Sequence, residues 1–362
     1  MNLSGAVKIN KCGVLILSVC VVIVFYYLLF NNSMGSHRFR SHGFLIRNPN
    51  EVDLRKLLIG SIQAAQYGGL EVLSVADADN IHAKTKGRTK EGANDPLTNA
   101  DLKSHCVMEQ GLKRLFSTVT IISEEDVHAD CSETSHFELD PTVIDEDIHL
   151  QDDFLVNADD VTIWIDPLDA TQEYTENLFQ YVTTMVCVAI RGEPVIGVIH
   201  NPFSQKTFWA WKDVAVSASL RKVKDEPVNK MAAVKNPKII ASRSHSGDVE
   251  HLIKMSFGEN TPIELAGGAG YKVLQVVFGN ATNYVHLTEI KKWDLCAGNA
   301  ILSALNGQMT SLKNQPILYE RDPQTFVNKD GVIASLRNHP YYAGKVYDYL
   351  QHSQMIKSTN SK

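Results

Sequence analysis

Carboxylate side chains gather in four separate segments of the sequence, each at the end of an expected helix or strand. The segments are Asp95-Pro-Leu-Thr-Asn-Ala-Asp101, Ser123-Glu124-Glu125-Asp126, Asp166-Pro-Leu-Asp169-Ala-Thr171 and Trp293-Asp294. If the fold brings these carboxylates together, they repel one another and resist ionising together. A divalent cation removes that conflict, and oxygen ligands without Cys or His suit Mg²⁺. The pattern therefore predicts a magnesium site that acts on a phosphate ester.

Each acidic segment also has an ordinary structural explanation when it is taken alone. Glu124-Glu125 after a strand could be a solvated turn, Asp166-Pro167 a turn former, and Asp294 a helix cap. The Asp95–Asp101 stretch could be one more helix start. However, no Lys or Arg occurs in residues 115–190, so the two middle segments have no local charge compensation. The four segments in combination favour the metal site.

Strands and helices alternate along the chain and are expected to position these segments. Helical periodicity begins at Val52, is interrupted at Gly68-Gly69 and continues to Val75. The other expected helices are 101–116, 249–257 and 293–306, and the expected strands are 119–122, 161–165, 182–190, 195–200 and 238–241. The polar, glycine-bearing stretch 84–92 is predicted to be a mobile loop. Because the alternation is not a regular βαβ repeat, we expect layered α/β packing.

The order of the motifs carries a resemblance to a known family. D-x-x-T-x-x-D, E-E-D, D-P-L-D-x-T and W-D resemble the Mg²⁺-dependent, lithium-sensitive phosphatase superfamily of inositol monophosphatase, over roughly residues 52–355. The resemblance implies an α+β fold, a layered α-β-α-β-α sandwich of the inositol monophosphatase/fructose-1,6-bisphosphatase type. We expect an N-terminal lobe, 51–230, with most metal ligands, and a C-terminal α/β lobe, 231–356, with Asp294 and the substrate-contacting segments.

The resemblance also implies a role for each site residue. The site would hold two or three Mg²⁺ ions through the carboxylates of Glu124, Asp166, Asp169 and Asp294 and the backbone carbonyl of Leu168. Asp101 and Thr171 would orient and deprotonate the attacking water. Many members have glycine where this chain has Ala170. Because alanine adds only a methyl group, the turn should survive unless φ is positive at this residue.

Two further segments bear on the substrate. Ala241–Ser246 offers hydroxyls and an imidazole, and Gly267–Lys272 offers backbone N–H groups and a cation. Either could be purely structural. Both resemble the nucleotide-contacting elements of a branch that hydrolyses 3′-phosphoadenosine 5′-phosphate (PAP), with contacts at Ser242, His245, Gly270 and Lys272.

The resemblance therefore implies removal of the 3′-phosphate of PAP, giving AMP and phosphate. In the Golgi lumen this would remove a sulfotransferase by-product and support glycosaminoglycan sulfation. The alternatives are an inositol phosphate or polyphosphate phosphatase and a catalytically inactive, membrane-anchored binding protein. A homodimer is possible for this superfamily. Nucleic acid is not an expected partner, because the formal net charge is -6.

The N-terminus predicts a membrane anchor. Cys12–Phe30 contains no charged residue, and as a helix it would be about 28 Å long, close to the thickness of a bilayer core. A cleaved signal peptide would have a shorter apolar region. Lys8 and Lys11 weakly favour a cytoplasmic tail, residues 1–11, so the tether 31–50 and the catalytic part would be lumenal. The resemblance implies a single-pass type II protein of the Golgi membrane.

Two smaller expectations follow from a lumenal location. Asn280-Ala281-Thr282 would be a glycosylation acceptor if it is exposed. Four cysteines follow the anchor, namely Cys106, Cys131, Cys187 and Cys296. They are too few for a disulfide scaffold, so we expect buried free thiols, although one disulfide remains possible.

Overall fold

The computed structural model describes residues 50–78, 81, 83–88, 94–125, 131, 137–144, 148, 150, 154–225, 237–243 and 248–360, with only the backbone of 94–95 and 354–360. Residues 49–362 group into one compact unit. The expected anchor, 12–30, and the tether up to residue 49 lie outside the described residues. Among the described helices, none combines the length and apolar character needed to cross a bilayer.

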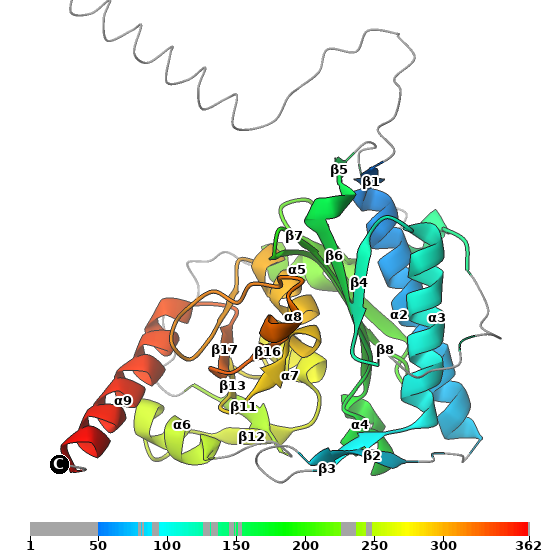
Figure 1. The fold of residues 1–362 in the computed structure, drawn as a ribbon. Coiled ribbons are helices and arrows are strands. Elements are labelled where there is room, and N and C mark those ends of the chain that lie inside the picture. Colours follow the sequence, from blue (N-terminus) through cyan, green and yellow to red (C-terminus); the bar gives the residue numbers. More distant parts are fainter. Residues whose placement is uncertain are drawn as a thin grey trace, which may run out of the picture. The chain divides into compact units, whose positions relative to one another are not determined.

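A six-stranded sheet forms the N-terminal half of this unit, in the order β10-β9-β8-β7-β6-β4. Its strands are β4 (Thr120–Ser123), β6 (Val161–Asp169), β7 (Thr183–Ile190), β8 (Glu193–Asn201), β9 (Lys206–Trp211) and β10 (Ala215–Val216). All neighbours are antiparallel except β4 and β6. Helices α2 (Leu54–Asp77) and α3 (Asn99–Leu115) lie side by side against one face (Figure 1). The short strands β1 (Glu51–Asp53) and β5 (Leu155–Asn157) pair beside the start of α2.

A five-stranded sheet forms the C-terminal half, in the order β12-β11-β13-β17-β15. Its strands are β11 (Ile239–Ser242), β12 (Ile263–Ala266), β13 (Asn283–His286), β15 (Gln308–Thr310) and β17 (Val332–Ser335). The remaining α-helices among the described residues are α4 (Thr171–Thr175), α5 (Ala218–Asp225), α6 (Val249–Phe257), α7 (Ala269–Val277), α8 (Lys292–Ala304) and α9 (His339–Asn360). Two further two-stranded pairs are β2 (Lys84–Arg88) with β3 (Asn94–Leu97), and β14 (Ile290–Lys291) with β16 (Val327–Asn328).

Strand alternation explains how the layers stack. In β6, Ile163 and Ile165 pack on the α2/α3 side, while Trp164 joins the core formed with α7 and α8. In β11, Ile240 joins that same core, while Ile239 and Ala241 pack against α6 and α9. The order is therefore α2/α3, six-stranded sheet, α7/α8, five-stranded sheet, α6/α9, which is the expected α-β-α-β-α sandwich (Figure 1). The expected lobe boundary near residue 230 lies outside the described residues, so the division into two lobes stays a prediction.

Two local predictions were wrong. The first helix continues through Gly68-Gly69, because both glycines let neighbours come close. A Cβ on Gly68 would lie 2.5 Å from Met108 Sδ on α3, and one on Gly69 would lie 2.6 Å from the ring of His200 on β8. Lys84–Arg88 is not a loop but the strand β2, which pairs antiparallel with β3. Backbone pairing across the hairpin outweighs the polar composition that predicted a loop.

The prediction of free thiols was also wrong. Within the described part of the chain, Cys106–Cys131 and Cys187–Cys296 form disulfides, with Cα–Cα distances of 5.2 and 5.6 Å. The partners are 25 and 109 residues apart in sequence, so only the fold brings them together. The second disulfide joins β7 to α8 across the buried core.

Candidate active site

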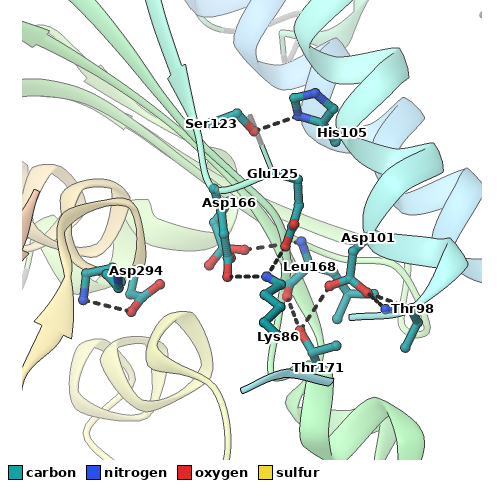
Figure 2. A network of polar contacts seen from close by, with 12 residues as sticks. Lys86, Thr98, Asp101, His105, Ser123, Glu125, Asp166, Leu168, Thr171 and Asp294 are labelled. Carbon is teal, nitrogen blue, oxygen red and sulfur yellow. Dashed lines mark hydrogen bonds and ion pairs between the residues drawn. The ribbon is translucent and has the colours of Figure 1, made fainter. Parts of the chain in front are cut away.

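Three of the predicted metal ligands converge. Glu124 follows β4, Asp166 lies in β6 and Asp294 lies in the first turn of α8, and each offers an oxygen within 4.8 Å of the others. Parallel pairing of β4 and β6 puts Ser123 opposite Ile165, which explains why the next residues, Glu124 and Asp166, are neighbours. Figure 2 shows Asp294 approaching the ends of these strands from the C-terminal half.

Electrostatics in this acidic cluster (Glu124, Asp166 and Asp294) favours a cation. Burial and then the charge of Glu124 raise the pKa of Asp166 well above its ordinary value. The same two causes raise the pKa of Asp294. Three carboxylates at this spacing repel one another when they are ionised, and the pKa values of two of them are raised. Coordination of a Mg²⁺ ion by these hard oxygen ligands would remove the repulsion.

A hydroxyl links the acidic turn to α3. Thr171 Oγ1 lies 3.0 Å from both Asp101 Oδ1 and the Leu168 carbonyl oxygen, so it can donate to either acceptor (Figure 2). Asp101 Oδ2 accepts from the backbone N–H of Thr98 at 2.7 Å and from its hydroxyl at 2.6 Å. Burial, opposed by these bonds from Thr98, raises the pKa of Asp101 to about 6. The structure therefore brings Asp101 and Thr171 into contact, while their roles in orienting and deprotonating a water stay predictions.

Asp169 is not one of the three grouped carboxylates, but its charge also raises the pKa values of Asp166 and Asp294. Its carboxylate accepts from the backbone N–H of Ala269 at 3.0 Å and of Gly270 at 2.8 Å, and from Thr183 Oγ1 at 3.1 Å. These N–H groups belong to the first turn of α7, where a helix favours an anion. The anion that the glycine-rich turn binds here is thus a side chain of the protein itself. The roles of Asp169 as a metal ligand and of Gly270 as a substrate contact stay predictions.

Of the other predicted substrate contacts, Ser242 and Lys272 are described by the structure and His245 is not. Ser242 ends β11 and is buried. Lys272 is buried too, with Nζ 3.4 Å from the Ala266 carbonyl oxygen and 5.3 Å from the ring centre of Tyr284. Burial lowers the pKa of Lys272, while the charges of Asp169, Glu173 and Asp294 oppose that shift. His245 lies outside the described residues.

Lys86 is a site residue that the sequence did not suggest. It extends from β2 to donate to Glu124 at 3.0 Å. It also donates to Glu125 (Figure 2). Burial alone would lower the pKa of Lys86, but the charges of Glu124 and Glu125 outweigh it and raise the pKa. The basic character of residues 84–92 was the only sequence signal that could have pointed to Lys86. Composition alone does not identify the carboxylates that this lysine contacts.

Ala170 has a positive φ, the one condition under which the sequence predicted a strained turn. Its φ is 72° and its ψ 44°, in the left-handed region. The turn survives with alanine, but a β-carbon is unfavourable there.

Ala170→Gly is therefore expected to raise the free energy of unfolding by about 0.5–1 kcal/mol, since removed strain exceeds the added freedom of the unfolded chain. Urea unfolding measures the change. Ala218→Gly, in the exposed first turn of α5, is the control and should lower stability. A loss of stability in Ala170→Gly as well would contradict the strain argument.

Comparison with known proteins agrees with this fold. The model of the inositol monophosphatase family matches residues 53–351. The chain is 45% identical to inositol monophosphatase 3 of Xenopus tropicalis over 308 residues, covering 83% of each chain. It is 45% identical to the Golgi-resident adenosine 3′,5′-bisphosphate 3′-phosphatase of Bos taurus over 312 residues, covering 82% of this chain and 81% of the relative. An IMPase from Thermotoga maritima has a similar fold, with a TM-score of 0.58 at 17% identity over 80% of this chain and 96% of the other.

The protein belongs to the inositol monophosphatase family. Its activity class is that of a phosphatase, a phosphoric monoester hydrolase.

Proposed function

We propose that the protein removes the 3′-phosphate of PAP, giving AMP and phosphate, with Mg²⁺ as its cofactor. The observation that carries the substrate is the pair of segments ending β11 and beginning α7, which bring Arg243 and Lys272 to the side of Asp169 and Glu173. A nucleotide bisphosphate has a second anion that the partly exposed Arg243 can contact, whereas an inositol monophosphate has none. The name of the Bos taurus relative agrees with this substrate.

The metal ligands of the proposal are Glu124, Asp166, Asp169, Asp294 and the carbonyl of Leu168. The family is in general Mg²⁺-dependent, and the acidic cluster suits that ion. Bound Mg²⁺ would neutralise charge on the phosphoryl oxygens and lower the pKa of a water.

The chain's own residues handle the water and its proton. Thr171 Oγ1 can accept a hydrogen bond from a water while it donates to Asp101, 3.0 Å away. Asp101 then receives the proton, and the two bonds from Thr98 keep its carboxyl group oriented. A pKa of about 6 leaves Asp101 largely ionised at neutral pH and still basic enough for this task.

An inositol phosphate is the second candidate substrate, because the Xenopus tropicalis relative is named inositol monophosphatase 3. The deciding experiment is phosphate release by the purified chain with Mg²⁺, comparing PAP with inositol 1-phosphate. We expect the higher kcat/KM with PAP, loss of activity with a chelator, and inhibition by lithium. A higher kcat/KM with inositol 1-phosphate would replace the proposal by the second candidate.

The cellular part of the proposal is a Golgi membrane protein with a lumenal catalytic unit. The name of the Bos taurus relative supports the compartment, and the apolar run Cys12–Phe30 supports the anchor. Two disulfides suit an oxidising compartment. Protease protection of the catalytic unit in sealed Golgi vesicles is the expected result, and digestion without detergent would contradict it.

A further inference from the structure

A buried carboxylate lies just behind the proposed substrate segments. Glu173 belongs to α4, the short helix that follows the Asp166–Thr171 turn, and its side chain is 3% exposed. The proposed chemistry does not use it. Burying a carboxylate without a cationic partner costs folding free energy. The partners of Glu173 therefore indicate its role.

Glu173 contacts both substrate segments. Arg243, the residue after β11, lies with Nη1 3.4 Å from Glu173 Oε1. On the other side, a Cβ on Gly267 would lie 2.4 Å from Glu173 Cδ and 2.8 Å from Oε1. The carboxyl group is thus packed directly against the turn between β12 and α7, where only a glycine leaves room for it.

The charges around Glu173 connect it to a second cation. The ammonium group of buried Lys272 feels the charge of Glu173, which opposes the effect of burial on its pKa. Arg243 is one-third exposed and also donates to Glu176 at 2.6 Å, at the surface end of α4. One carboxylate therefore contacts an arginine from one substrate segment and packs against the glycine turn of the other.

We propose that Glu173 is a positioning residue for the phosphate that is not hydrolysed. It holds Arg243, which is partly exposed, and the Gly267–Lys272 turn in place relative to the acidic cluster, so that the second phosphate of a bisphosphate meets an oriented arginine beside that turn. This inference rests on the proposed function, because only a substrate with two phosphates would depend on both segments. Glu173 itself need not touch the substrate.

The test is Glu173→Gln, which keeps the volume of the side chain and removes its charge. We expect KM for PAP to rise at least about tenfold, because small displacements of positioning groups are costly. The kcat for PAP should stay within about twofold, and KM for p-nitrophenyl phosphate, which has a single phosphate, should not change. Asp160→Asn is the matched control: it removes the ion pair with Arg191, 2.8 Å long, before the start of β6, and should leave both KM values unchanged.

Two further variants keep the test independent of the folding of Glu173→Gln. Arg243→Gln, at a partly exposed position, should raise KM for PAP similarly, and the double variant should add little, since one contact is lost in each. Gly267→Ala should have the same effect by crowding the Glu173 carboxyl group.

Each result decides the matter. A selective rise of KM for PAP supports the inference. An unchanged KM for PAP in folded Glu173→Gln and Arg243→Gln, or an equal rise for both substrates, overturns it while the proposed function stands. A wild-type chain that does not hydrolyse PAP overturns the proposed function and this inference together.

Discussion

Asp166→Asn is expected to lower the phosphatase turnover at least about a thousandfold while the fold is kept. Asp166 is buried in the acidic cluster, and an uncharged side chain there would bind a divalent cation far more weakly. Loss of charge stabilisation at the reacting phosphate typically costs about 10²–10³ per group, and a lost metal ligand should cost more. Folding should survive, because the amide oxygen can still accept the bond from the Leu168 N–H, 3.1 Å away.

Two measurements check this prediction. Phosphate release gives the turnover, and thermal unfolding with and without Mg²⁺ gives metal binding. The melting temperature of the wild type should rise on addition of Mg²⁺, and that of Asp166→Asn should not. Asp160→Asn serves as the control for removing a carboxylate close to β6, and should behave like the wild type. A variant with normal turnover and a normal response to Mg²⁺ would rule out the metal role of Asp166.

The second large effect concerns stability. Cys187→Ala together with Cys296→Ala is expected to lower the free energy of unfolding by about 5 kcal/mol, the chain-entropy value for a loop of this length. The disulfide closes a sequence separation of 109 residues and joins β7 to α8. Because Cys296 is two residues from Asp294 in α8, we also expect weaker Mg²⁺ binding.

Urea unfolding measures the loss, and the other disulfide provides the matched comparison. Cys106 and Cys131 are separated by only 25 residues, so replacing that pair by alanines should cost less, about 3.5 kcal/mol. Equal losses in the two variants would contradict the dependence on loop length. No loss in the Cys187/Cys296 variant would contradict the chain-entropy argument itself.

Local sequence patterns determined the elements and much of the candidate site. Apolar runs predicted the strands now seen as β6, β7 and β8, which are buried on both faces over most of their length. The acidic motifs follow these elements directly, so parallel pairing of β4 and β6 was enough to bring Glu124 to Asp166. Asp101 and Thr171 also meet as expected.

Other features were decided only by the tertiary structure. The disulfide partners, the ion pair of Glu173 with Arg243, and the bonds of Asp169 to the first turn of α7 join residues 25 to 109 positions apart in sequence. Composition describes each of these residues but does not name its partner. In the same way, the sequence predicted a helix break at Gly68-Gly69. The structure shows that both glycines lie inside the helix and allow the close approach of Met108 and His200. Periodicity reports which face of an element is buried, whereas pairing depends on how whole elements stack, and no short stretch of sequence contains that information.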